Sequence, residues 1–241
     1  MNPFRRHFIL ATCLALVVTL VASAPGKAGD VPYRRMAPLN KYLMTDRQAE
    51  IRLAQSAAPP AISLHATILV LGPHGYETAE KGSNRFTCLV ERSWMSPFSS
   101  AEFWNWRMRG PICYNPAASR SILIYTLRRT NRALSGQSKS EMLDRIRAAV
   151  AAKELPTPEV GSMSYMLSKS GYLGDGAGAW MPHLMFYAPQ ADAANGGASW
   201  GANLPGSPVV LDTSHRIVPE PETIFMVPVA RWSDGTAAPR M

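Results

Sequence analysis

Apolar positions along the chain fall into short strand-like runs in two groups, with a helical section between them. The first group is residues 67–71, 76–80 and 86–92, which Gly-, Pro- and Asn-rich turn signals separate, and this order predicts an antiparallel meander. The second group is residues 162–167, 183–187, 208–212 and 223–229. Residues 183–187 are apolar on both faces, which is typical of a central strand covered on both sides.

Helix-start signals mark three helices. A capping box, Thr-Asp-Arg-Gln, opens a predicted helix over residues 45–58. Asn115 as N-cap with Pro116 at the first helical position predicts a second helix, which Gly136 ends. Another capping box at residues 138–141 opens a third helix. We expect the second and third helices to form a helical hairpin.

These elements predict an α+β domain, with a mostly antiparallel sheet of five to seven strands and the helical hairpin and N-terminal helix packed against one face. Helices do not alternate with strands, which disfavours a doubly wound parallel fold. A single domain is expected over residues 39–232, after an extended leader at 25–38 and before a polar tail at 233–241. Residues 93–114 are rich in aromatics and prolines without a clear period, and we interpret them as an irregular segment.

The first residues have the pattern of a secretory signal peptide. Arg5 and Arg6 precede an apolar stretch over residues 8–21, which is shorter than the roughly 20 apolar residues that span a bilayer. Small residues follow it, so we predict a signal peptide over residues 1–24 with cleavage between residues 24 and 28. The mature chain is then periplasmic or secreted and has no membrane span. The arginine pair is also compatible with twin-arginine export, so the general and the twin-arginine routes both stay open.

The charge balance adds little about partners. The chain has 25 basic and 17 acidic residues, and removal of the signal peptide leaves an excess of basic residues that are mostly scattered. Arg128, Arg129 and Arg132 share a predicted helix, and we interpret them as a solvated helix face rather than a nucleic-acid site. No nucleic-acid partner is therefore expected.

Two cysteines, Cys88 and Cys113, remain once Cys13 leaves with the signal peptide. An even pair in an oxidising compartment predicts a disulfide, which would hold the 93–114 segment against the sheet. Two free thiols are the alternative. A zinc site is disfavoured because a closed site requires four ligands.

Named catalytic motifs are absent from the sequence, including Gly-x-Ser-x-Gly, His-Glu-x-x-His and phosphate-binding Gly-rich loops. No cofactor or metal ion is predicted, and whether the chain is an enzyme stays open. His74 lies in a turn, where it either reaches a pocket or is simply exposed. His183 begins the most apolar strand, where it is either a buried hydrogen-bonded residue or a general base.

Aromatic and amide side chains give the remaining candidates for ligand binding. Trp94, with Arg92 just ahead of it, belongs to a segment that either binds sugars, aromatics or peptides or packs against the sheet. Trp200 and Asn203 lie in a Gly/Asn/Pro-rich loop and either border a pocket or pack the loop.

Four short runs resemble those of exported bacterial proteins that are uncharacterised. They are residues 88–94, 110–116, 182–187 and 200–203. The resemblance implies no activity and no site. Our leading hypothesis is a non-catalytic exported domain that binds a small molecule or an envelope protein near residues 93–114, His183 and the 190–206 loop. The alternatives are a secreted hydrolase with a histidine general base and a structural envelope component without a pocket.

Overall fold

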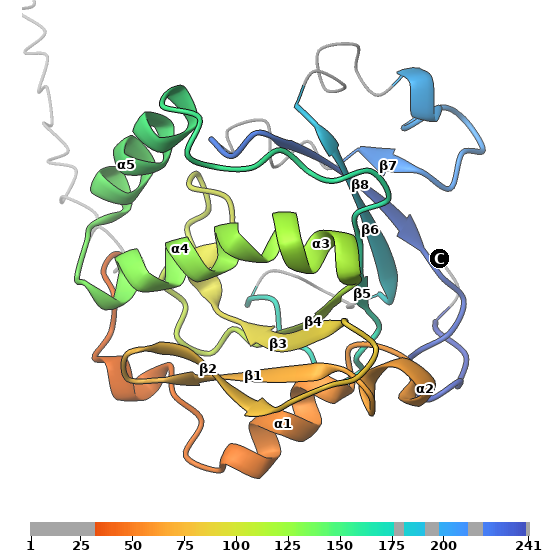
Figure 1. The fold of residues 1–241 in the computed structure, drawn as a ribbon, viewed down its shortest axis with the longest axis horizontal. Helices are drawn as coiled ribbons and strands as arrows, with labels where there is room; N and C mark the ends of the chain where they lie inside the picture. The colour runs from red at the N-terminus through yellow and green to blue at the C-terminus, as the bar shows by residue number, and fades with distance from the viewer. Residues whose placement is uncertain (1–31, 176–180, 191–197, 212–218, 240–241) are drawn as a thin grey trace, which may run out of the picture. The chain divides into compact units, whose positions relative to one another are not determined.

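Eight strands form one sheet in the order β2-β1-β3-β4-β5-β6-β8-β7 (Figure 1). The structure is a computed structural model, and it describes residues 32–175, 181–190, 198–211 and 219–239. The strands are β1 (Thr67–Gly72), β2 (Gly75–Glu80), β3 (Thr87–Glu91), β4 (Gly110–Tyr114), β5 (Met163–Met166), β6 (His183–Pro189), β7 (Val210–Leu211) and β8 (Glu222–Pro228). The predicted mixed α and β fold with a mostly antiparallel sheet is confirmed. The sheet has more strands than the five to seven predicted.

Several predictions made from the sequence fall on residues that the structure does not describe. These are the signal peptide over residues 1–24 with its cleavage region, the first part of the leader, part of the 190–206 loop, and the last two residues of the polar tail. In the described ranges, no helix has the length and apolar character needed to cross a membrane.

The predicted meander of the first three strands is wrong. β1 and β2 form an antiparallel hairpin, but β3 lies on the other side of β1 and runs parallel to it, with Thr67 opposite Thr87 and Ile68 opposite Cys88. The connection from β2 must therefore pass the end of β1. Turn signals and alternation predict that a strand exists but do not determine its neighbours, because strand pairing depends on contacts far apart in the sequence.

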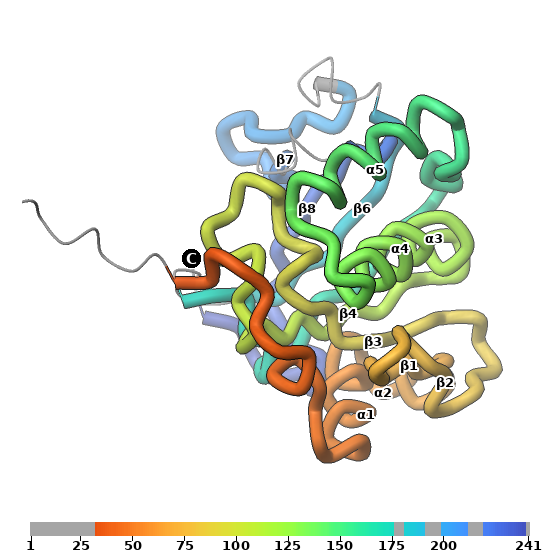
Figure 2. Tube along the Cα trace, turned by 90° about the vertical axis from the view of Figure 1, so that its left-hand side faces the viewer, coloured from red at the N-terminus to blue at the C-terminus, as the bar shows by residue number. Residues whose placement is uncertain are grey.

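The helices cover both faces of the sheet, and the prediction that they pack against one face is wrong (Figures 1 and 2). The helix bounds are α1 (Arg47–Gln55), α2 (Pro60–Ser63), α3 (Pro116–Ser121), α4 (Leu123–Leu134) and α5 (Lys139–Ala151), with short 3-10 helices η1 (Leu39–Lys41), η2 (Ser93–Met95) and η3 (Ala198–Trp200). α1 packs on β1, β3 and β4, while α3 packs on β4 and β5 and α4 on β2. Alternate side chains of each strand consequently belong to different cores: Val90 packs with Ile51 of α1, and Leu89 packs in the larger core with Ile112.

The predicted second helix is two helices. Asn115 caps α3 as expected, because its side chain accepts a hydrogen bond from the Ala118 N–H at 2.9 Å. The helix is interrupted at Ile122, and the buried Ser121 hydroxyl next to it donates to the Ala117 carbonyl at 2.9 Å. Such a bond to the carbonyl four residues earlier often bends a helix, and Ser121 also accepts from the Glu159 N–H at 3.2 Å. The capping box at Ser138 is present as predicted.

The predicted disulfide between Cys88 and Cys113 is present, but its surroundings differ from the prediction. Cys113 does not end an irregular segment, since residues 110–114 form β4 and Cys113 lies directly opposite Cys88 on β3. The bond therefore joins two neighbouring central strands. Both sulfurs lie in the core beneath α1, together with Ile68 and Ala54.

Candidate functional site

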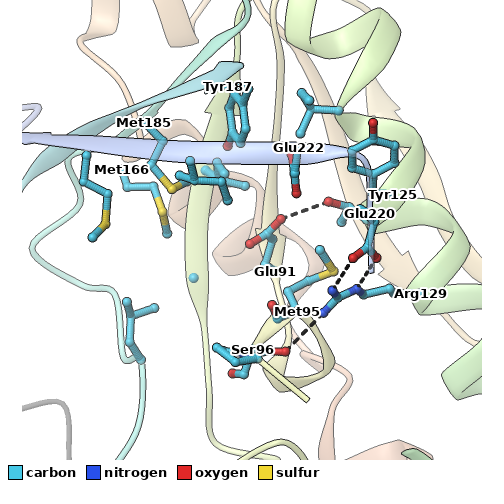
Figure 3. Close-up of a pocket in the computed structure, with 18 of the residues that line it drawn as sticks. Glu91, Met95, Ser96, Tyr125, Arg129, Met166, Met185, Tyr187, Glu220 and Glu222 are labelled. Carbon is cyan, nitrogen blue, oxygen red and sulfur yellow. Dashed lines mark hydrogen bonds and ion pairs between the residues drawn. The ribbon is translucent and has the colours of Figure 1, made fainter. Parts of the chain in front are cut away.

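A cavity of about 660 Å³ lies on the α3–α4 face of the sheet (Figure 3). Its floor is made by alternate residues of consecutive strands, since successive side chains of a strand point to opposite faces. These floor residues are Glu91 of β3, Gly110, Ile112 and Tyr114 of β4, Met166 of β5, His183, Met185 and Tyr187 of β6, and Glu222, Ile224 and Met226 of β8. The sheet register therefore decides which side chains meet in the cavity.

Two further parts of the chain close the cavity. α4 contributes Tyr125, Thr126 and Arg129, which lie on one stripe of that helix. Residues 95–97, Ser99, Ser100 and Met108, from the segment between β3 and β4, form another wall. The aromatic segment noted in the sequence thus borders the cavity, while its own rings pack together beside it, with Phe103 and Trp104 edge to face at 4.8 Å between ring centroids.

A half-buried carboxylate, that of Glu91, forms the polar part of the floor. Glu91 Oε1 accepts hydrogen bonds from the Tyr114 hydroxyl at 2.7 Å and from the Thr126 hydroxyl at 3.0 Å. Burial raises the pKa of Tyr114 well above its usual range, and the negative charge of Glu91 raises it further. Tyr114 therefore stays protonated and donates to the carboxylate. Tyr187 of β6 also belongs to the floor, and its hydroxyl forms a hydrogen bond of 2.8 Å with the Ser164 hydroxyl.

Arg129 and Glu220 form a buried ion pair on the wall of the cavity. Arg129 Nε lies 2.7 Å from Glu220 Oε1, and Arg129 Nη2 lies 2.7 Å from Glu220 Oε2. The guanidinium also donates to the Trp94 carbonyl. A further bond, to the Ser96 carbonyl, is drawn in Figure 3. The expectation that Arg129 belongs to a solvated helix face is wrong, because its side chain is only 3% exposed. This bidentate geometry fixes both side chains.

Methionine side chains make up much of the remaining lining. Six methionines among the described residues line the cavity: Met95, Met108, Met166, Met181, Met185 and Met226. Figure 3 shows Met166 and Met185 side by side, on the side away from Arg129 and Glu220. The cavity thus has a thioether-rich part and a part rich in carboxylates and hydroxyls.

Two of the six ligand-binding candidates from the sequence, Arg92 and His183, line this cavity. His183 Nδ1 lies 2.9 Å from the Met181 carbonyl oxygen. Arg92 is fully buried and forms an ion pair of 2.8 Å with Glu50. Trp94 is buried in the core behind the cavity, where its indole N–H donates to the Thr130 hydroxyl at 2.9 Å.

The other three candidates lie elsewhere. Trp200 stacks on Phe225 at 4.5 Å between ring centroids, and Phe225 points to the face of the sheet opposite the cavity. Asn203 belongs to the same loop, and its side-chain oxygen accepts from the Leu211 N–H at 3.3 Å. His74 is exposed in the turn between β1 and β2. The structure does not bring these three residues to the cavity.

Sequence reasoning missed most of the residues that line the cavity, including Glu91, Arg129, Glu220 and Met166. One signal was available: Ile122, Tyr125 and Arg129 share one stripe of the second predicted helix, so an arginine lies in line with buried residues. The remaining lining residues depend on strand order, which the sequence does not determine.

Comparisons with protein families, with curated proteins and with solved structures find no match to this chain. Among the described residues, no three His, Cys, Asp or Glu side chains come together in a way that could hold a metal ion. The fold and the cavity define an α+β protein with a pocket on one face of its sheet.

Proposed function

We propose that the protein binds a small, largely apolar molecule in the cavity and that this binding is non-catalytic. The cavity volume of about 660 Å³ supports the proposal, because ligand pockets typically measure roughly 300–1,000 Å³. The lining also supports it, since apolar and thioether side chains predominate and a few polar groups gather at one part. This combination is typical of sites that bind an apolar body and orient it by a few hydrogen bonds.

The polar side chains of the lining indicate which kind of hydrogen-bonding group the ligand carries. Carboxylates accept hydrogen bonds, so Glu91 and Glu222 favour a ligand that donates through a hydroxyl or an N–H group. The rings of Tyr114, Tyr125 and Tyr187 add flat apolar surface next to them. We therefore expect an apolar molecule with one donor group.

A cavity-filling variant tests the proposal. N-phenyl-1-naphthylamine is a suitable probe, because it is neutral and apolar, carries one N–H group and fluoresces when it leaves water. Ile224→Phe places a ring in the cavity, and we expect it to weaken probe binding about tenfold, the equivalent of 1.4 kcal/mol. The matched control is Val227→Phe on the same strand, because Val227 does not line the cavity.

Saturable binding that Ile224→Phe weakens and Val227→Phe leaves unchanged would support the proposal. No saturable binding, or equal effects of the two variants, would overturn it. Native mass spectrometry of the purified protein adds a second measurement, since a retained molecule should be lost from the Ile224→Phe variant.

The secreted hydrolase remains the second candidate, because His183 belongs to the cavity floor. The Nδ1 contact with a carbonyl leaves the lone pair of the neutral ring on Nε2, which is the atom that a general base requires. Hydrolysis of p-nitrophenyl esters that His183→Gln abolishes and His74→Gln preserves would favour this candidate over a binding protein. The third hypothesis, a structural envelope component, predicts no cavity. The cavity therefore supports the binding protein and the hydrolase over this hypothesis.

We also propose that the protein is exported to the periplasm or the medium. The N-terminal pattern and the disulfide support this, since disulfides persist in oxidising compartments. N-terminal sequencing of protein from its own compartment should begin between residues 25 and 29. Alkylation without prior reduction should label neither Cys88 nor Cys113, and labelling of both would contradict the proposal.

A further inference from the structure

The thioether-rich part of the cavity contains an ordered cluster of four side chains on three neighbouring strands, β5, β6 and β8. Met166 lies directly opposite His183, and Met185 lies directly opposite Met226. His183 and Met185 are two residues apart on β6 and therefore point to the same face. Directly opposite residues have their Cβ atoms about 4.5–5.5 Å apart, so these side chains are close neighbours. We call this set the methionine–histidine cluster.

The orientation of His183 suits it to hold a metal ion. A carbonyl oxygen only accepts hydrogen bonds, so the contact of 2.9 Å with the Met181 carbonyl assigns the hydrogen to Nδ1. The neutral ring then has its lone pair on Nε2. Histidines that bind metals almost always donate their other ring N–H to a carbonyl, a carboxylate or water, because this fixes the ring and its tautomer.

We infer that the methionine–histidine cluster binds a soft monovalent metal ion, Cu(I). Thioether ligands select Cu(I), whereas Zn²⁺ and harder ions prefer imidazole, thiolate and carboxylate sets. The flexible side chains of Met166 and Met185 flank His183 from β5 and β6, which allows one imidazole and two thioethers to approach one ion.

Two features of the surroundings support this inference: one concerns competing sulfur ligands, and the other concerns charge. Cys88 and Cys113 are bonded to each other on the other face of the sheet and offer no thiolate. The cavity lining also carries three carboxylates, those of Glu91, Glu220 and Glu222, against the two guanidinium groups of Arg92 and Arg129 among the described residues. This charge balance favours a cation over an anion.

The experiment titrates the full chain in its disulfide form with Ag(I), which shares the ligand preference of Cu(I) and needs no reductant. Cys13, where it is retained, is first alkylated so that it cannot bind silver. Calorimetry should give one tight equivalent. Met166→Leu with Met185→Leu keeps the side-chain volume and should weaken that equivalent by about 100-fold, and His183→Gln should weaken it about tenfold.

The matched control is Met142→Leu, because Met142 is a buried methionine of α5 that does not line the cavity. This variant should bind Ag(I) like the wild type. Methyl NMR spectra of ¹³C-labelled methionine should show silver-dependent shifts of the resonances that Met166→Leu and Met185→Leu remove, and not of the Met142 resonance. A competition titration with Cu(I) and bicinchoninate should give the same order of variants.

Absence of a tight equivalent, or an equal effect of Met142→Leu and the double variant, would overturn the inference. The inference uses the cavity of the proposed function but not its ligand. Loss of Ag(I) binding with retained probe binding would remove the metal site alone. Ag(I) binding that Ile224→Phe leaves intact, in a protein that never binds the naphthylamine probe, would remove the proposed small-molecule function alone.

Discussion

At the scale of single residues, the buried ion pair of Arg92 with Glu50 connects several elements of the fold. Arg92 also donates to the Tyr42 and Val90 carbonyls, and Glu50 accepts from the Leu71 N–H, so the pair joins α1 to β1, β3 and the residue that follows η1. Both side chains are almost completely buried. Removal of one partner leaves a charge without compensation in the core.

We therefore expect Glu50→Gln to lower the free energy of unfolding by about 3–5 kcal/mol, measured by urea denaturation. Glu77→Gln is the control, because Glu77 pairs with Arg47 on the surface and such pairs contribute about 1 kcal/mol or less. A loss for Glu50→Gln as small as that for Glu77→Gln would contradict the structural role of the buried pair.

Buried tyrosines predict how stability changes at alkaline pH. Burial raises the pKa of Tyr42 to about 12 and raises the pKa of Tyr114 and Tyr187 well above the usual value of about 10. The stabilisation linked to these hydroxyls is complete below the unfolded pKa near 10 and is lost as pH rises through the folded pKa values. Urea denaturation above pH 10 should thus show a falling free energy of unfolding.

The tyrosinate absorbance gives the control for this prediction. In guanidinium chloride the eight tyrosines should titrate together near their usual pKa. In the native protein most of the change should appear only at higher pH, together with unfolding. Native titration that coincides with the titration in denaturant would contradict the burial of these side chains.

At the scale of elements, the crossing of the β2–β3 connection over the end of β1 depends on Gly82. A Cβ atom at this position would lie 2.3 Å from the Thr67 backbone nitrogen and 2.5 Å from the His65 carbonyl oxygen. The connection is also held there by hydrogen bonds from the Ser83 and Asn84 N–H groups to the His65 carbonyl. The parallel pairing of β1 with β3 requires this close approach.

We expect Gly82→Ala to destabilise the protein by about 1–3 kcal/mol, because backbone atoms must move to accept the methyl group. Gly72→Ala is the control, since a Cβ there meets its neighbours at an ordinary 3.5 Å. Thermal unfolding of the two variants measures the difference. Equal melting temperatures would contradict the crossing as described.

The elements that the sequence predicts well are those that local signals define. The Ser138 capping box and the Asn115 cap are present because their hydrogen bonds lie within four residues. Strand positions follow from alternation, but the order of the strands does not, and the position of β3 beside β1 was missed for this reason. The candidate site depends on that order: His183 was noticed alone, and its neighbour Met166 comes from another strand.

In the whole molecule, the two faces of the sheet carry different features. One face holds the disulfide, α1 and a core of aliphatic residues, while the other holds the cavity with its ion pair and methionines. The strands β3 and β4 belong to both faces, with Cys88 and Cys113 directed to one and Glu91 and Ile112 to the other. The disulfide and the proposed binding site therefore lie on opposite sides of the same strands.

This separation predicts that the disulfide can be removed without loss of the cavity. Cys88→Ala with Cys113→Ala opens a loop of 25 residues and should lower the free energy of unfolding by about 3 kcal/mol, measured by urea denaturation. Binding of the naphthylamine probe, and of one tight Ag(I), should persist below the unfolding transition, because neither cysteine lines the cavity. The double alanine variant is preferable to chemical reduction, since free thiols would themselves bind silver. Loss of probe binding in a variant that retains its native near-ultraviolet circular dichroism would show instead that the two faces are coupled through β3 and β4.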